Sequence, residues 1–313
     1  MSPPLNVSFE FFPPADEAGE RALAVAVSRL APLGPQFVSV THGADGSHRA
    51  RTLDWARRLH REWGLPVAPH LAAAGSSRTE VRALAARYWQ EGFRRLVALR
   101  GDVPTGPEKA TVGGKGVVEG YGFASELVAD LAPRYRFEIF VAAYPEGHPD
   151  GGGVEADVRN LQRKIDAGAS AAITQFFFDT DAFLRYRDRC RAAGIEVPIV
   201  PGILPIRRFE QVLRFAGRCG ASIPAWLHRR FEGLEADGEA ARRVAMQVAV
   251  AQVRRLRAQG VEQFHFYTLN RADPTHAACE ALQLRPPGAQ VAPSSQAPPR
   301  VGVDLAQHRG AAE

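Results

Sequence analysis

The sequence predicts an α/β protein with the (β/α)₈ fold, the TIM barrel, in which eight parallel strands alternate with eight helices. Three observations support this. Short apolar runs rich in β-branched and aromatic residues alternate with amphipathic helical runs. The ends of the apolar runs recur about every thirty residues, the length of one strand–helix unit. No GxGxxG motif follows the first run, which argues against an open nucleotide-binding sheet.

The expected elements follow this alternation through the chain. The first strand ends at two prolines, and the first helix carries Leu23, Val27 and Leu30 on one face. The expected strands cover residues 7–12, 36–41, 66–71, 95–100, 137–143, 171–176, 197–203 and 263–268. The expected helices cover residues 16–33, 49–63, 76–91, 120–133, 153–168, 179–193, 207–219, 237–259 and 272–283.

Two strand-to-strand steps are longer than the rest and indicate insertions. The first predicts an enlarged loop at 101–120, after strand 4, which is rich in glycine, proline and lysine. The second predicts an extra helical segment at 222–234, before the last strand. Residues 1–284 are expected to form one barrel domain. Residues 285–313, rich in proline and small polar residues, are expected to be a disordered tail.

Composition limits the classes of function. The chain has 313 residues, 45% of them apolar, and no apolar run long enough to span a bilayer. The N-terminus has no signal-like segment, and three well-separated cysteines form no CxxC motif, so we expect a cytoplasmic protein with reduced thiols. A net charge of +5, dispersed along the chain, argues against nucleic acid and suits an anionic small molecule.

Polar residues stand where most of the expected strands end. In this fold the carboxyl ends of the strands carry the active site. Taken singly, a histidine there can be a core residue, an Arg–Asp pair a local ion pair, and a glutamine a helix cap. Their coincidence at one rim predicts an active site. The residues are Glu10, Thr41, His42, His70, Arg100, Gly101, Asp102, Tyr144, His148, Gln175 and Arg271, with Gln211 and Phe215 on the helix after strand 7.

Glu10 is the one carboxylate in the apolar first strand. Burial beside phenylalanines disfavours the charged form, so the pKa of Glu10 is expected to be raised. A raised pKa is what a proton donor near neutral pH requires. The alternative is that Glu10 points to solvent from the polar face of a half-exposed strand.

The helix expected at 153–168 predicts a nucleotide site. Three glycines precede it, and Asp157, Asn160 and Lys164 share one face, with Arg163 beside them. Backbone N–H groups and cations can hold phosphates, and an acid and an amide can hold ribose hydroxyls. The alternative is an ordinary solvated helix face. No HxH or HExxH spacing links His42, His70 and His148, so no metal site is predicted.

Nine motifs resemble the methylenetetrahydrofolate reductase family, over residues 5–284. They are SFEFFPP at 8–14, FVSVTHGA at 37–44, APHL at 68–71, VALRGD at 97–102, VAAYPE at 141–146, DAGASAAITQFFFD at 166–179, PGILP at 201–205, IPAW at 223–226 and FHFYTLNR at 264–271. The resemblance is to the bacterial form that has the catalytic domain alone. It implies an FAD-containing barrel that reduces 5,10-methylenetetrahydrofolate to 5-methyltetrahydrofolate for methionine synthesis, with ping-pong use of NADH or NADPH. Homo-oligomers are usual in the family.

The resemblance also implies roles for individual residues. Glu10 matches the general acid, and Asp102 matches an acid that tunes the flavin and contacts the pterin. Thr41 and Gln175 match positions near the nicotinamide. The folate-binding positions are Gln175, Gln211, Phe215 and Arg271. The cofactor-binding positions are Thr41, His42, Ala44, His70, Arg100, Gly101, Asp102, Ala124, Tyr144, His148, Asp157, Asn160, Arg163 and Lys164.

Two other functions fit part of this pattern. A pterin-binding methyltransferase barrel that passes a methyl group to a corrinoid would explain Gln175 and the acidic rim, but it would not explain the glycine-led helix. A barrel that only binds a folate or a flavin would explain the rim without any role for Glu10 in proton transfer.

Overall fold

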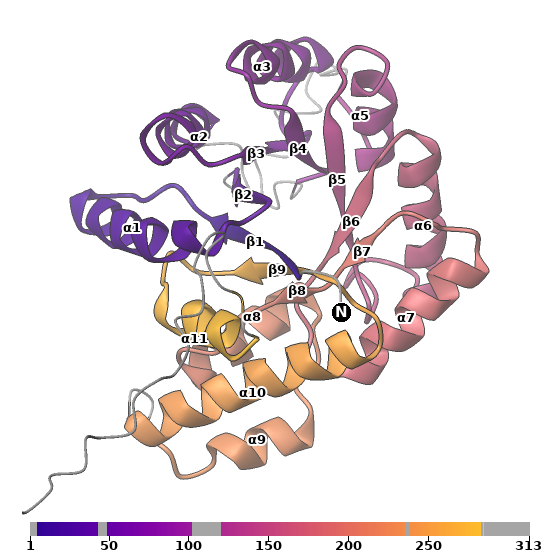
Figure 1. Ribbon diagram of the computed structural model, residues 1–313. Coiled ribbons are helices and arrows are strands. Elements are labelled where there is room, and N and C mark those ends of the chain that lie inside the picture. Colours follow the sequence, from indigo (N-terminus) through magenta and orange to yellow (C-terminus); the bar gives the residue numbers. More distant parts are fainter. Residues whose placement is uncertain (1–4, 43–48, 102–119, 236–237, 283, 285–313) are drawn as a thin grey trace, which may run out of the picture.

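The computed structural model describes residues 5–42, 49–101, 120–235, 238–282 and 284, and these form a nearly closed barrel (Figure 1). All strand pairs are parallel, in the order β7-β6-β5-β4-β3-β2-β1-β9-β8, and the helices surround them. The strands are β1 (Asn6–Phe11), β2 (Phe37–Val40), β3 (Val67–Ala72), β4 (Arg95–Leu99), β5 (Glu138–Ala143), β6 (Ala171–Thr174), β7 (Ile199–Val200), β8 (Gly202–Ile203) and β9 (Gln263–Tyr267).

The helices follow the strands along the chain and cover the outside of the barrel (Figure 1). Several begin at a side-chain cap: Asp16 caps α1, and Ser77 with Glu80 forms a capping box at α3. They are α1 (Glu17–Leu30), η1 (Ala31–Leu33), α2 (Arg49–Trp63), α3 (Arg78–Gln90), α5 (Ala124–Leu131), α6 (Val154–Asp166), α7 (Thr180–Ala192), α8 (Phe209–Cys219), α9 (Ala225–Phe231), α10 (Glu239–Ala258) and α11 (Asp273–Ala281).

The seventh barrel strand consists of two pieces, and this is where the barrel closes. β7 pairs with β6 and β8 pairs with β9, and Pro201 separates them. Proline has no N–H to donate, so side chains complete the seam. Gly202 N–H donates to Thr174 Oγ1 at 2.9 Å, and Tyr267 Oη donates to Thr174 O at 2.7 Å. A Cβ on Gly202 would lie 2.1 Å from Thr174 O, so only glycine fits.

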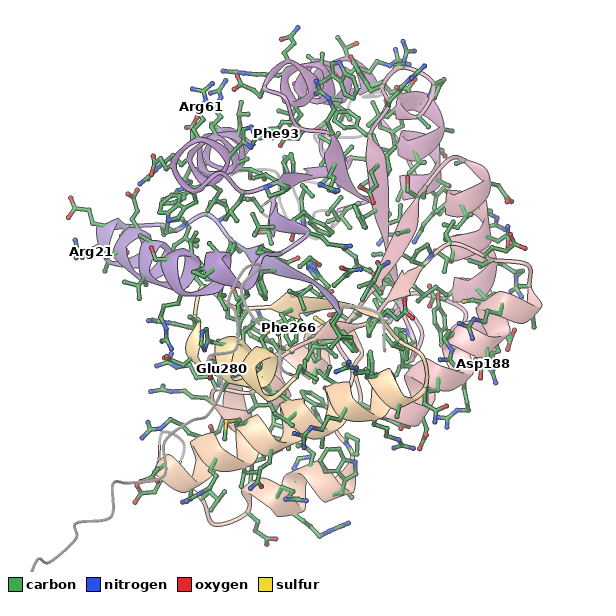
Figure 2. All side chains as sticks on the ribbon, viewed as in Figure 1. Arg21, Arg61, Phe93, Asp188, Phe266 and Glu280 are labelled. Atoms are coloured by element: carbon green, nitrogen blue, oxygen red, sulfur yellow. The ribbon has the colours of Figure 1, made fainter. Side chains whose placement is uncertain are left out.

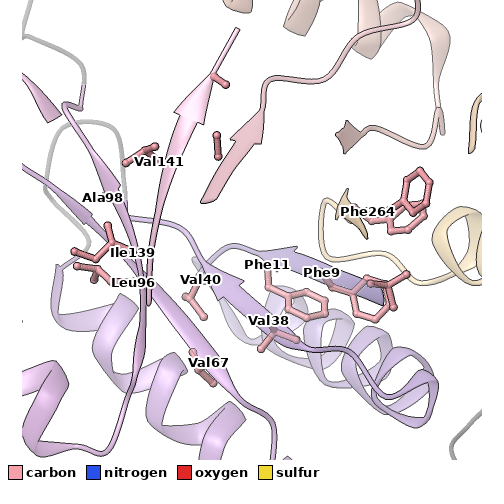
Figure 3. Close-up of a cluster of buried hydrophobic side chains, with 14 of the residues drawn as sticks. Phe9, Phe11, Val38, Val40, Val67, Leu96, Ala98, Ile139, Val141 and Phe264 are labelled. Atoms are coloured by element: carbon pink, nitrogen blue, oxygen red, sulfur yellow. The ribbon is translucent and has the colours of Figure 1, made fainter. Parts of the chain in front are cut away.

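The main core lies between the sheet and the helices. Phe9 and Phe11 of β1 belong to it, together with Val38 and Phe264 from the neighbouring strands β2 and β9 and Ile139 from β5 (Figure 3). Alternation along β1 then directs Ser8 and Glu10 to the inside of the barrel. The outer helix faces carry charged side chains such as Arg21 and Asp188, whereas Phe266 lies in the interior (Figure 2).

The inside of the barrel is apolar in its lower part. Phe37, Val97, Phe140, Ile173 and Val200 form a separate buried cluster there, drawn from five strands. The Phe37 and Phe140 rings are 4.6 Å apart between centroids. This apolar cluster fills the barrel at the amino ends of the strands. The polar inward-facing residues therefore collect at the carboxyl ends of the strands.

The predicted fold is confirmed, with local differences. The expected strand at 197–203 is split at Pro201, because proline interrupts the ladder. The helix expected at 120–133 begins only at Ala124, and the expected extra segment before the last strand contains α9. The tail and most of the enlarged loop, residues 102–119, lie outside the described residues. Within the described part of the chain, no helix combines the length and apolarity needed to cross a membrane.

Candidate active site

A cavity of about 470 Å³ opens at the carboxyl ends of the strands, beside β2 to β5. It lies within the size range of small-molecule sites. All the predicted cofactor-binding residues that the structure describes line its wall. These are Thr41, His42, His70, Arg100, Gly101, Ala124, Tyr144, His148, Asp157, Asn160, Arg163 and Lys164. Ala44 and Asp102 lie outside the described residues. The cavity therefore collects residues from four successive strand–helix units, while their roles remain predictions.

Glu10 lies next to this cavity and contacts two imidazoles. Its Oε2 is 3.4 Å from His70 Nε2, on β3, and 3.7 Å from His265 Nε2, on β9. Burial raises the pKa of Glu10, but the polar contacts and charge interactions with His265 and His70 outweigh it and lower the pKa to about 2. The expectation of a raised pKa was therefore wrong. The first strand indicates only that Glu10 is partly buried, and its histidine partners come from other strands.

His265 continues the contact away from Glu10. Its Nδ1 is 2.7 Å from Ser8 Oγ, and Ser8 lies two residues before Glu10 on the same inward face of β1. When Ser8 donates to Nδ1, the imidazole proton is on Nε2 and faces the Glu10 carboxylate. Ser8, Glu10 and His265 therefore form a chain of polar contacts across the β1–β9 pair. His265 is fully buried at 1% exposure, which keeps this chain away from bulk water.

Lys164 projects from α6 into the cavity as a buried cation. Its Nζ donates to Ala142 O at 2.8 Å. Burial lowers the pKa of Lys164 to about 8, against the opposing effect of Asp157. Asp157 is itself buried, and burial raises its pKa although its carboxylate accepts the N–H of His148. An anion bound beside Lys164 would favour its charged form, so this position is suited to binding an anion.

The glycine-rich turn before α6 brings the backbone close to the cavity. Gly147 and Gly153 have φ angles of 90° and 81°, in the left-handed region that favours glycine. The turn packs against His148, whose ring meets the Tyr144 ring edge-on at 4.7 Å. The first N–H groups of α6 then follow directly after Gly153, the N-cap.

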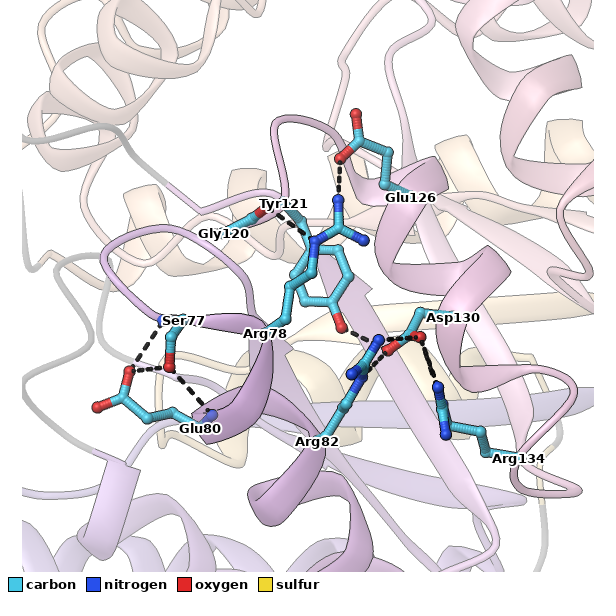
Figure 4. Close-up of polar contacts among 9 residues, drawn as sticks. All are labelled: Ser77, Arg78, Glu80, Arg82, Gly120, Tyr121, Glu126, Asp130 and Arg134. Atoms are coloured by element: carbon cyan, nitrogen blue, oxygen red, sulfur yellow. Dashed lines mark hydrogen bonds and ion pairs between the residues drawn. The ribbon is translucent and has the colours of Figure 1, made fainter. Parts of the chain in front are cut away.

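A polar network fixes the segment that leads into α5, at the edge of the cavity. Asp130 accepts hydrogen bonds from both Arg82 and Tyr121, and Arg78 lies over the Tyr121 ring and donates to Gly120 O (Figure 4). These contacts join α3 to α5. They hold the start of α5, and so place Phe123 and Ala124 in the cavity wall.

The predicted folate-binding residues follow β6, β8 and β9 along the chain. Gln175 follows β6, and its Oε1 accepts the N–H of Phe176 at 3.0 Å. Gln211 and Phe215 are on α8, where Phe215 packs with an apolar cluster that also contacts Tyr267. Arg271 is exposed after β9. None of the four is among the described residues that line the cavity.

Sequence reasoning assigned no role to four residues around Glu10: Ser8, His265, Thr268 and Asn270. His265 and Tyr267 alternate along the last strand as Ser8 and Glu10 do along the first, which places each pair on one face. The end of the last expected strand places Thr268 and Asn270 at the rim, but their contacts depend on the turn geometry. In the described residues, no cluster of three or more histidine, cysteine, aspartate or glutamate side chains is placed to hold a metal.

A polar cavity at the carboxyl ends of parallel strands is the active-site position of (β/α)₈-barrel enzymes, so the fold and site define a protein of that class. Comparison with known proteins gives the particular family. The family model described as methylenetetrahydrofolate reductase matches residues 3–283. The chain therefore belongs to the methylenetetrahydrofolate reductase family of folate-reducing enzymes.

Individual relatives agree with this assignment. The 5,10-methylenetetrahydrofolate reductases of Escherichia coli and Salmonella typhimurium are each 46% identical over 90% of this chain and 92% of their own. An Arabidopsis thaliana methylenetetrahydrofolate reductase (NADH) is 36% identical over 84% of this chain but only 46% of its own. Among solved structures, a Clostridium thermocellum protein that binds 5-methyl-5,6,7,8-tetrahydrofolic acid has a TM-score of 0.56 at 14% identity, covering 89% of this chain and 94% of its own. That last likeness concerns the fold alone.

Proposed function

We propose that the protein reduces 5,10-methylenetetrahydrofolate to 5-methyltetrahydrofolate with bound FAD and NADH, in two alternating half-reactions. NADPH is the alternative donor. In this scheme one proton goes to the folate nitrogen whose bond to the methylene carbon breaks, and one hydride goes to that carbon. The observation that carries the proposal is the position of Glu10, in contact with His265 and with His70, which itself lines the cation-bearing cavity.

The cavity suits a dinucleotide such as FAD. Arg163 and Lys164 place positive charge in its wall, and Lys164 is buried, so an anion there would stabilise its charged form. Asn160 and Asp157 stand on the same face of α6 and offer groups for ribose hydroxyls. Bound FAD would supply the redox chemistry, accepting hydride from the nicotinamide and passing it to the folate.

Glu10 would deliver the proton to the folate. In the ligand-free site its carboxylate is ionised, since its pKa is about 2. Desolvation by a bound pterin would favour the neutral carboxylic acid and so raise the pKa of Glu10. Glu10, held in place by His70 and His265, would then direct a proton at the substrate.

Absorbance spectroscopy tests the proposal directly. The purified protein loaded with FAD should be yellow, should bleach with NADH under anaerobic conditions and should recover its colour with 5,10-methylenetetrahydrofolate. The Glu10→Gln variant should still bleach but recover colour about 100-fold or more slowly, the usual range for loss of a general acid. Glu138→Gln, a carboxylate paired with Arg95 where β5 begins, is the matched control and should behave as wild type. Protein that stays colourless with FAD, or full activity of Glu10→Gln, would contradict the proposal.

A further inference from the structure

The turn after β9 has an unusual backbone. Leu269 and Asn270 have φ angles of 49° and 54°, and they are the only non-glycine residues with positive φ in the part of the chain that the structure describes. Leucine rarely adopts this conformation, because its Cβ meets the backbone. Two such residues in succession persist only where the surroundings fix them, and such positions cluster at functional sites.

Asn270 is fixed by two hydrogen bonds to a single residue of the neighbouring strand. Its Oδ1 accepts the N–H of Phe12 at 3.0 Å, and its Nδ2 donates to Phe12 O at 2.8 Å. Asn270 is only 5% exposed, so these bonds are shielded from water. Its amide side chain therefore continues the pairing of β9 with β1 beyond the last backbone pair, Glu10 with Tyr267.

Thr268 makes the contact to Glu10 itself. Its Oγ1 donates to the backbone carbonyl of Glu10 at 2.6 Å and accepts the N–H of Asn270 at 3.1 Å. Thr268 is 3% exposed. On the other side of β1, Thr41 N–H donates to Phe11 O at 2.9 Å. Thr268 N–H also donates to the Glu10 carbonyl, at 3.4 Å. The end of β1 is thus held from both sides, and on the β9 side by side chains as well as by the backbone.

These bonds bear on the Glu10 side chain through the geometry of the strand pair. His265 belongs to β9, the strand that continues into Thr268 and Asn270, and its Nε2 is 3.7 Å from Glu10 Oε2. A shift of β1 relative to β9 would change this distance and the distance to His70 on β3. Proton transfer depends on placement to within about 1 Å, where an error costs roughly 100-fold in rate.

We propose that Thr268 and Asn270 are positioning residues that hold the Glu10 carboxylate at its histidine partners for proton transfer to the folate. This rests on the function proposed above. The two residues act through the backbone of β1 and touch neither substrate nor cofactor in this role. The half-reaction that needs the proton depends on them, and the half-reaction that reduces the flavin does not.

The test measures the two half-reactions separately by anaerobic stopped-flow absorbance. Asn270→Ala and Thr268→Val are compared with wild type, and Thr268→Ser serves as the conservative variant that keeps the hydroxyl. We expect flavin reduction by NADH to stay within about twofold of wild type and reoxidation by 5,10-methylenetetrahydrofolate to fall roughly 10- to 100-fold in the first two variants. Thr268→Ser should retain most of the rate. Ser170→Ala, which removes a 3.2 Å hydrogen bond to Ile139 N–H near the opposite end of the barrel, controls for general destabilisation.

A second readout needs neither cofactor nor activity. The carboxyl ¹³C resonance of Glu10, assigned by its loss in Glu10→Gln, reports the titration of that group. The groups that face it are His70 on β3, and His265 and Tyr267 on β9. In wild type the pKa should be about 2, and in Asn270→Ala it should rise towards the ordinary 4.5 as the histidines separate from the carboxylate.

The outcomes separate the two proposals. Normal reoxidation in both Asn270→Ala and Thr268→Val, or a parallel fall of both half-reactions, overturns the positioning role. If Asn270→Ala does not fold, the Thr268→Val and Thr268→Ser pair decides by the same criteria. If wild type itself is not reoxidised by the folate, the proposed function fails. The ¹³C titration then decides whether the two residues hold Glu10.

Discussion

The contacts of Glu10 predict a specific loss of stability in acid. The pKa of Glu10 is about 2 in the folded protein and 4.5 for an ordinary glutamate. Because the folded pKa is the lower one, the carboxylate stabilises the fold above pH 4.5, and this stabilisation disappears as the pH falls towards 2. The difference corresponds to about 3 kcal/mol at neutral pH, at about 1.4 kcal/mol per pH unit. The side chain is 21% exposed, so solvent screening makes this an upper value.

The measurement is urea denaturation of wild type and Glu10→Gln at several pH values. Roughly 2 kcal/mol of the stabilisation should be lost between pH 5 and pH 3, where the unfolded chain begins to take up the proton. Histidine side chains in general are already protonated at pH 5, so their titration contributes little to this window. The free energy of unfolding of wild type should therefore fall about 2 kcal/mol further than that of Glu10→Gln. Parallel curves for the two proteins between pH 5 and pH 3 would refute the inferred contacts with His70 and His265.

Two further predictions concern the seam and the cavity. Gly202→Ala should lower the free energy of unfolding by about 3 kcal/mol, because the new Cβ would overlap Thr174 O. Gly217→Ala, which has open space around it in α8, should raise the free energy of unfolding by about 0.5 kcal/mol. Urea denaturation of both variants checks this, and equal effects of the two substitutions would contradict it. FAD affinity, measured by flavin fluorescence, should weaken as the pH rises through 8, where Lys164 loses its proton, and Lys164→Met should bind more weakly and lack this pH dependence. A wild-type affinity that is constant from pH 7 to pH 9.5 would remove Lys164 from that role.

The position of the site was predictable from the sequence because it follows from periodicity. The regular spacing of the strand ends brought residues such as His70 and Tyr144 to one rim, and both line the same cavity. The spacing of Asp157 and Lys164 on one helix was similarly informative, since a helix fixes which residues share a face. Inferences of this kind need only the local geometry of one element and the order of the elements.

The electrostatics of the site were not predictable in this way. The pKa of Glu10 depends on which side chains stand opposite it across the barrel, and these come from β3 and β9. The first strand alone indicates burial, and burial raises the pKa of Glu10 instead of lowering it. The proline at position 201 was likewise visible in the sequence. The hydrogen bonds of Thr174 and Tyr267 that complete the seam were not, because they depend on which groups face Pro201 once the barrel has closed.

The depressed pKa also limits how Glu10 can work. An isolated acid with a pKa of about 2 is protonated in about one molecule in 10⁵ at pH 7, which would make it a poor donor at that pH. Burial and the two histidines act on this pKa in opposite directions, since burial raises it and the histidines lower it. A site that is wet when empty and dry when the pterin is bound would therefore hold Glu10 as a carboxylate before binding and shift it towards the acid at the moment of transfer. This change in the surroundings of Glu10 is what would make so low a pKa in the empty site compatible with the acid role proposed for it.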